Sequence, residues 1–266
     1  MRNIIGGQIG YDNLLKKNLN FLKKNYIYPN GRCALYFILK KIKKKVKTIY
    51  VPSYLCESIL QPIRTLNMNY KFYEVKNDFR FQLPKENNSA IIFLNYFGKK
   101  NSKKIENLKN NLKKNIYYIQ DCTHNVFEKK TNLNNFNKNN IFRFASIKKY
   151  IPFPIGGINN IGQIKLINSN SIEKKMFKKI FYTLKKRNNY FLKSNNKINE
   201  LFEKDLLLKQ NDFKLFENKK IIKCSVPLFL KKRINHYDLK EILIKRDENY
   251  KLIQRKLDKN IKIVSK

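Results

Sequence analysis

Short apolar segments alternate with helical patterns along the first 150 residues, and this alternation constrains the fold more than any other feature of the sequence. The apolar segments lie at residues 48–52, 70–75, 90–97, 116–119 and 142–147, and helical periodicity is found at residues 32–44, 59–63 and 103–114. Segment 90–97 is almost wholly apolar, as expected for a strand that is covered on both faces. Such an alternation predicts an α/β architecture, with a mostly parallel sheet between helices.

This rhythm stops beyond Gly156-Gly157, which we interpret as a turn. The other predicted elements are helices at 13–24 and 237–257, strands at 163–167 and 221–230, and a long polar helix or helix pair at 172–208. We therefore predict a large domain at residues 1–170 and a short C-terminal part, helical or α+β, at residues 171–266.

The chain is strongly basic, with 58 Lys and Arg against 19 Asp and Glu and a formal net charge of +39. Such a charge is typical of proteins that bind nucleic acid or anionic membranes. Here the lysines are spread from Lys16 to Lys266 together with many Asn and Ile residues, which indicates a bias in composition rather than one basic surface. A nucleic-acid-binding protein remains an alternative, and the charge would also attract anionic metabolites.

Cysteine and histidine spacing predicts a reduced chain without a metal site. The four cysteines are too far apart for a C-x-x-C pair, and the two histidines add no zinc-ligand spacing. The sequence contains no run of about 18 uncharged apolar residues, and its first residues contain no apolar run of signal-peptide length. We therefore expect a cytoplasmic protein without a membrane span.

Polar and aromatic residues follow several of the predicted strands. Because ligands of parallel α/β sheets bind outside the carboxyl ends of the strands, these residues form the predicted site. They are Pro52-Ser53-Tyr54, Asn95-Tyr96-Phe97-Gly98, Asp121-Cys122-Thr123-His124 and Lys148-Lys149.

The order of the motifs along the chain resembles the DegT/DnrJ family of sugar aminotransferases over roughly residues 1 to 160. The matching segments are Ile5-Gly6-Gly7, Asn30-Gly31-Arg32-Cys33-Ala34-Leu35, Val51-Pro52-Ser53-Tyr54, Asn95-Tyr96-Phe97-Gly98, Gln120-Asp121-Cys122-Thr123-His124, Ser146-Ile147-Lys148-Lys149 and Pro152-x-Pro154-x-Gly156-Gly157. The resemblance implies a fold-type-I transferase whose large domain binds pyridoxal 5'-phosphate.

The resemblance also implies residues that contact the cofactor ring. Lys149 stands seven residues before Gly156, the spacing of the lysine that bonds the cofactor in this family, and Lys148 is the alternative. Asp121 would bond the protonated ring nitrogen, which makes the ring a better electron sink. His124, three residues later, stands where the family has a Gln or His that contacts the ring hydroxyl.

For the cofactor phosphate, the resemblance implies Gly31, Arg32 and Cys33, which open a predicted helix. Backbone N–H groups and the helix dipole favour an anion at such a place. Ser146 offers a hydroxyl to the same phosphate, and Tyr54 is the predicted substitute for the aromatic ring that stacks on the cofactor in related enzymes.

The implied activity is the transfer of an amino group from an amino acid donor to a keto sugar, itself linked to a nucleotide, in surface-polysaccharide synthesis. A homodimer is implied as well. Related enzymes have a fuller C-terminal domain, so a member of the family without catalytic competence is the first alternative, and a basic nucleic-acid-binding protein is the second.

Overall fold

A single mixed sheet forms the centre of the molecule. The computed structural model describes residues 27–94, 96–98, 115–124, 140–149, 156–161 and 239–256, together with positions 175, 178, 182 and 226. Within these residues, six strands pair in the order β2-β1-β3-β4-β5-β6. Their bounds are Thr48–Pro52 (β1), Tyr70–Tyr73 (β2), Ser89–Leu94 (β3), Ile116–Asp121 (β4), Ile141–Ser146 (β5) and Gly157–Asn159 (β6).

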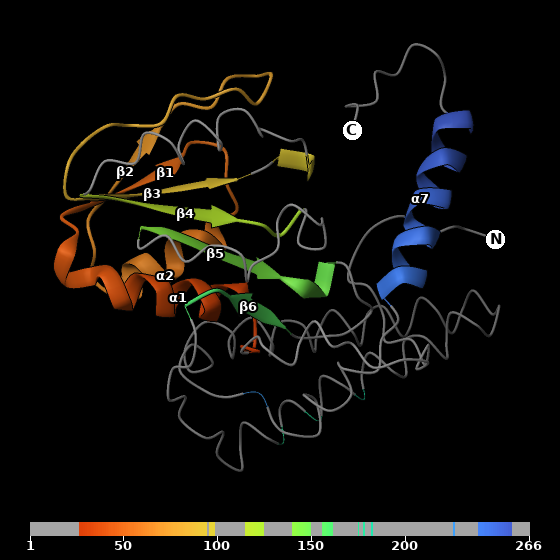
Figure 1. Ribbon diagram of the computed structural model, residues 1–266, viewed down its shortest axis with the longest axis horizontal. Helices are drawn as coiled ribbons and strands as arrows, with labels where there is room; N and C mark the ends of the chain where they lie inside the picture. Colours follow the sequence, from red (N-terminus) through yellow and green to blue (C-terminus); the bar gives the residue numbers. More distant parts are fainter. Residues whose placement is uncertain are drawn as a thin grey trace, which may run out of the picture.

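The first five strands are parallel and β6 runs antiparallel to β5. Figure 1 shows the sheet with α1 and α2 on one side of it. The prediction of an α/β fold with a mostly parallel sheet and helices is therefore confirmed. Because parallel strands end at the same edge, the residues after β1, β3, β4 and β5 lie along one side of the sheet.

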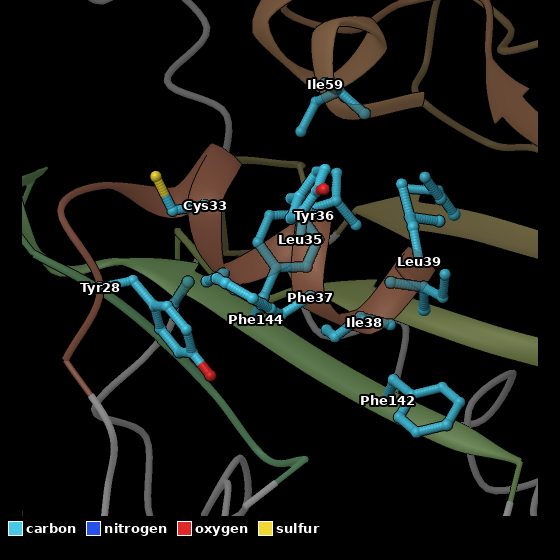
Figure 2. Packing of buried hydrophobic residues seen from close by; sticks show 14 of the residues in the cluster. Tyr28, Cys33, Leu35, Tyr36, Phe37, Ile38, Leu39, Ile59, Phe142 and Phe144 are labelled. Carbon is cyan, nitrogen blue, oxygen red and sulfur yellow. The ribbon is translucent and has the colours of Figure 1, made fainter. Parts of the chain in front are cut away.

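Helix α1 (Gly31–Ile42) forms the centre of the larger hydrophobic core. Apolar residues recur on its sequence at helical spacing, and Asn30 caps its first turn. Leu35 and Ile38 are fully buried, and each contributes about 2 kcal/mol through burial of apolar surface. Figure 2 shows side chains of α1 packed around Phe142 and Phe144 of β5. This packing fixes the N-terminus of α1 against the end of the sheet that carries the predicted site.

Helix α2 (Leu60–Thr65) packs beside α1 and follows the short 3-10 helix Glu57–Ile59. A second cluster, rich in aromatic residues, is formed by residues that alternate along the strands with those of the larger core, such as Ile91 and Phe93 of β3. Because both of its faces are covered, the central strand β3 is apolar from Ala90 to Leu94.

Several strand boundaries differ from the sequence prediction; β4, for example, continues two residues further, to Asp121. The segment 90–97 is a strand only to Leu94, because Tyr96–Gly98 is a 3-10 turn in which Phe97 has φ 55°. The Gly156-Gly157 turn was predicted wrongly in part, since Gly157 opens β6 and forms an isolated antiparallel bridge with Tyr28. Strand β2 ends at Tyr73, two residues early.

Several predictions lie outside the described residues. They are the helices at 13–24 and 103–114, the strands at 163–167 and 221–230 apart from Val226, nearly all of the helix at 172–208, and the boundary near 170. Lys175, Lys178 and Tyr182 are helical, and Val226 is buried in the larger core.

The C-terminal helix is confirmed as α7 (Leu239–Lys256), which Figure 1 shows beyond the carboxyl ends of the strands. Arg246 of this helix donates a hydrogen bond of 3.2 Å from Nη1 to the carbonyl oxygen of Lys149. Among the described helices, none is both long and apolar enough to cross a membrane.

Candidate cofactor site

Asp121, the last residue of β4, is the charged group at the centre of the site. Its side chain is buried, and its Oδ1 accepts a 2.8 Å hydrogen bond from the N–H of Thr123. Burial raises the pKa of the carboxyl above its ordinary value, while the bonds from Thr123 and the charges of His124 and Lys149 act in the opposite direction. A cation bound against Asp121 would therefore stabilise the ionised carboxylate.

Thr123 connects the ends of β4 and β5. Its Oγ1 accepts a 3.1 Å hydrogen bond from the N–H of Ser146, while its own N–H is bound to Asp121. One residue therefore fixes the distance between the carboxylate at the end of β4 and the hydroxyl at the end of β5.

Lys149 ends the 3-10 turn Ile147–Lys149 that follows β5. Its side chain is exposed, and its charge acts on the carboxylate of Asp121. The amine and the carboxylate thus come from the ends of two neighbouring strands and interact electrostatically. The structure places Lys148 in the same turn and describes nothing of its side chain.

His124 lies beside the 3-10 turn that follows β3. The N–H of Phe97 donates to Nδ1 of His124 over 3.1 Å, and the two rings stack at 28° with their centroids 6.3 Å apart. When His124 is protonated, its charge also acts on Asp121. Phe97 from the end of β3 thus contacts His124, and residues from the ends of β4 and β5 act on the carboxylate of Asp121.

The N-terminus of α1 lies against the end of β5. A Cβ atom added at Gly31 would lie 3.1 Å from Cβ of Ser146, so helix and strand are in close contact here. The backbone approaches still more closely at Gly157, where an added Cβ would lie only 2.0 Å from the carbonyl oxygen of Asn30. Only glycine fits at position 157, and this close approach aims the N-terminus of α1 at the site.

A buried hydroxyl provides a test of whether this end of the site fits a phosphate. Oγ of Ser146 is shielded from solvent and has no hydrogen-bond partner among the described residues, although buried polar groups are normally paired. It lies next to the first turn of α1, where N–H groups and the helix dipole favour an anion. An unpaired donor beside such a helix end fits the phosphate of pyridoxal 5'-phosphate, and Asp121 fits its ring nitrogen.

Two residues predicted to contact the phosphate, Cys33 and Arg32, have other partners in the structure. The N–H of Cys33 is bound to Oδ1 of Asn30 at 3.0 Å, so this cap must open before Cys33 contacts a phosphate. Arg32 directs Nη1 toward Gln61 of α2, at 2.8 Å. The side chain of Arg32 therefore supports α2, and its backbone is the part that lies at the helix end.

Tyr54 belongs to an aromatic cluster rather than to the charged centre. Its side chain is 58% exposed, and its ring packs on Phe79 and Tyr96, each with centroids 5.7 Å away. The cluster reaches His124 through Phe97, which packs edge-on against Phe79 at 4.9 Å. In the described residues, Phe97 and not Tyr54 is the ring that contacts a residue of the charged centre.

The sequence analysis named the segments that contain Thr123, Phe97 and Gly157 but assigned no role in the site to these three residues. The bond between Thr123 and Asp121 could have been predicted, since an Asp side chain commonly accepts a hydrogen bond from the backbone N–H two residues further on. The roles of Phe97 and Gly157 depend on contacts with distant segments and leave no local pattern.

Comparisons with known proteins give structural neighbours only. No protein-family model and no curated protein matches the chain. The aminotransferase AspB from Helicobacter pylori is 16% identical with a TM-score of 0.41, and the match covers 58% of this chain and 51% of that one. The sugar aminotransferase CalS13 from Micromonospora echinospora is 10% identical, with a TM-score of 0.40 and coverage of 59% and 44%.

A third neighbour is the GDP-4-keto-6-deoxymannose-3-dehydratase ColD with bound GDP-perosamine, at 17% identity, a TM-score of 0.40 and coverage of 51% and 39%. The chain thus spans about half the length of the solved structures that it matches. The likeness to pyridoxal-phosphate-dependent enzymes concerns the fold alone.

Proposed function

We propose that this protein is a pyridoxal-phosphate-dependent aminotransferase that acts on a keto sugar, linked to a nucleotide, in surface-polysaccharide biosynthesis. The observation that carries the proposal is the buried carboxylate of Asp121, on which the charge of Lys149 acts from the end of the neighbouring strand β5. A buried carboxylate is costly unless a cation pairs with it, and a protonated pyridine nitrogen is such a cation.

Each end of the site has its own task in this proposal. Asp121 holds the proton on the ring nitrogen, and Ser146 with the first turn of α1 binds the phosphate. When bound, the cofactor supplies an electron sink for the carbon that carries the amino group. Lys149 Nζ would hold the cofactor through its aldehyde group and would move the proton at the carbon that carries the amino group.

The substrate class is supported by charge and by the motifs. A net charge of +39 raises the concentration of anions, such as a nucleoside diphosphate, around the whole protein. This attraction does not depend on where the anion binds. The amino donor would be an amino acid such as glutamate, as the resemblance to sugar aminotransferases implies.

We propose a homodimer in the cytoplasm as the working form. The cysteines that the structure describes, Cys33, Cys56 and Cys122, are not in disulfide bonds, which suits a reducing compartment. The dimer is an inference from the resemblance alone, and sedimentation of the purified chain tests it.

The matched pair Lys149→Ala and Lys148→Ala tests the proposal. The full chain, titrated with pyridoxal phosphate, should develop the absorption band of a lysine-bound cofactor, and addition of glutamate should convert it. Lys149→Ala should abolish the band and lower the rate of amino-group exchange by about 10²- to 10⁴-fold. Lys148→Ala should retain both, because only one of the two adjacent side chains can reach the ring.

Two results would count against the proposal. If the unaltered chain gives no band at any cofactor concentration, it does not bind the cofactor through lysine. If the band forms and glutamate does not change it, the chain is a member without catalytic competence. The exposed side chain of Lys149 is the observation that favours this second candidate, because catalytic lysines act in sites that exclude water.

A further inference from the structure

Phe97 adopts a backbone conformation that its side chain disfavours. Its φ of 55° and ψ of 21° lie in the left-handed region, where a bulky residue is a clear outlier. Such conformations persist only where the surroundings hold them, and they cluster at functional sites. Phe97 must therefore be held by specific contacts, and these contacts indicate what the conformation is for.

The contacts hold Phe97 from both sides. On one side its N–H donates to Nδ1 of His124 and its ring stacks on the imidazole. On the other side Phe79 packs against it edge-on at 4.9 Å, and Phe79 in turn contacts Tyr96. The hydroxyl of Tyr96 donates to the carbonyl oxygen of Tyr54, which ties this cluster to the loop after β1.

The hydrogen bond from Phe97 determines which nitrogen of His124 carries the proton. A neutral imidazole has one protonated and one unprotonated nitrogen, and an N–H donor can bind only the unprotonated one. With Nδ1 accepting from Phe97, the proton is on Nε2. A doubly protonated imidazole would lose this bond, because Nδ1 would then be a donor facing a donor.

We propose that Phe97 is a positioning residue, whose left-handed backbone and N–H hold His124 as the Nε2–H tautomer and fix the plane of its ring. Resting on the proposed function, this makes His124 a hydrogen-bond donor to the ring oxygen of the cofactor in its ionised form. An imidazole presenting an unprotonated nitrogen would instead require that oxygen to keep its proton. The tautomer of His124 therefore selects which charge state of the cofactor ring can bind.

The test is the nitrogen NMR spectrum of the histidine side chains in the full chain without added cofactor. The chain has two histidines, so His236→Gln leaves the signals of His124 alone. We expect a protonated Nε2 and an unprotonated Nδ1 at neutral pH, without averaging between tautomers. Observation of the Nδ1–H tautomer, or of an averaged spectrum, overturns the proposal.

A pair of substitutions separates the backbone of Phe97 from its ring. Asn accepts the left-handed conformation readily, so Phe97→Asn should keep the Nε2–H tautomer and lose only the ring-current shift of the His124 protons. Val disfavours that conformation, so Phe97→Val should displace the N–H and give a mixture of tautomers. If both variants keep one pure tautomer, Phe97 does not set it. If both lose it, the ring rather than the left-handed backbone sets the tautomer, and the proposal is wrong.

Folding and cofactor binding are controlled separately. The far-UV circular dichroism of each variant reports whether it folds, and if Phe97→Val does not, the spectra of the unaltered chain and of Phe97→Asn still decide. Because the tautomer is measured without cofactor, a chain that never binds pyridoxal phosphate can still confirm the role of Phe97. Conversely, a chain that binds it with the wrong tautomer refutes this inference alone.

Discussion

The two ends of the candidate site are formed by different kinds of chemical groups. The phosphate end consists of backbone and small side chains, where Gly31 and Ser146 meet and Gly157 lies against Asn30. The ring end consists of titratable and aromatic side chains, namely Asp121, His124, Lys149 and Phe97. The geometry of the phosphate end is determined by how closely two backbone segments can approach. The properties of the ring end are determined by charges in a partly buried environment.

This difference predicts how each end responds to change. At the phosphate end, Tyr28 and Gly157 exchange two backbone hydrogen bonds of 2.8 Å, and the N–H of Gly156 is bound to the carbonyl oxygen of Pro29 at 3.0 Å. Added atoms have no space there, so substitutions should act on stability at every pH. At the ring end, substitutions should act through charge and should depend on pH.

The largest effect is expected for Gly157→Ala. Its new Cβ would lie 2.0 Å from the carbonyl oxygen of Asn30, and backbone cannot move aside as a flexible side chain can. We expect a loss of about 3 kcal/mol in the free energy of unfolding, measured by urea denaturation. Gly31→Ala is the matched control, since its nearest contact is 3.1 Å and to a side chain. Equal losses in the two variants would show that close backbone approach is not what fixes this end.

A smaller effect is expected for Asn30→Ala. Oδ1 of Asn30 accepts the N–H of Cys33 and so caps α1. Its removal should lower the free energy of unfolding by about 1 kcal/mol, whereas Asn30→Asp should keep the cap and lose little. The same two variants also test whether Cys33 contacts a phosphate. If Cys33 contacts phosphate once the cap opens, Asn30→Ala should not weaken phosphate binding, and Asn30→Asp should weaken it through repulsion.

The smallest effect is expected at the ring end, for Asp121→Asn, and it should appear as a pH dependence. Burial raises the pKa of Asp121 in the folded chain above its unfolded value of 3.8. The folded state therefore binds the proton more tightly, and the stability that this supplies is present below the unfolded pKa and lost as pH rises through the folded pKa. The Asp121→Asn variant does not lose stability in this way, because its amide does not titrate.

Urea denaturation of both forms across acid and neutral pH measures the difference. Relative to the unaltered chain, Asp121→Asn should become more stable as pH rises, while the other carboxylates cancel in the comparison. A difference that stays constant with pH would mean that Asp121 is not held in a place that disfavours its charge. Added pyridoxal phosphate should reduce this difference in stability, because the protonated ring nitrogen pairs with the carboxylate of Asp121 and not with the amide of the variant.

Much of the fold and part of the site follow from local sequence. The alternation of apolar and helical segments predicted five parallel strands, because a strand covered on both faces must be apolar throughout. Placing Asp121 and Ser146 at one edge needed only the rule that parallel strands end together. The break at Asn30-Gly31 likewise predicted the start of α1, since Asn is a strong helix cap.

Other parts of the site could not be read from local sequence. The 3-10 turn at Tyr96–Gly98 interrupts a segment whose apolar pattern predicts a continuing strand, and only the contact with His124 explains it. Arg32 and Cys33 opened the predicted helix, and their actual partners, Gln61 and Asn30, depend on how α1 packs.

The local sequence indicates which segments form strands and where α1 begins, because hydrophobic period and capping are properties of neighbouring residues. Tertiary packing determines how the ends of the strands and of α1 meet. The pairing of β6 with β5 brings Gly157 against Asn30, and the packing of β3 beside β4 brings Phe97 to His124. Such contacts join residues that are distant in sequence, and close packing of the whole sheet and its helix selects them.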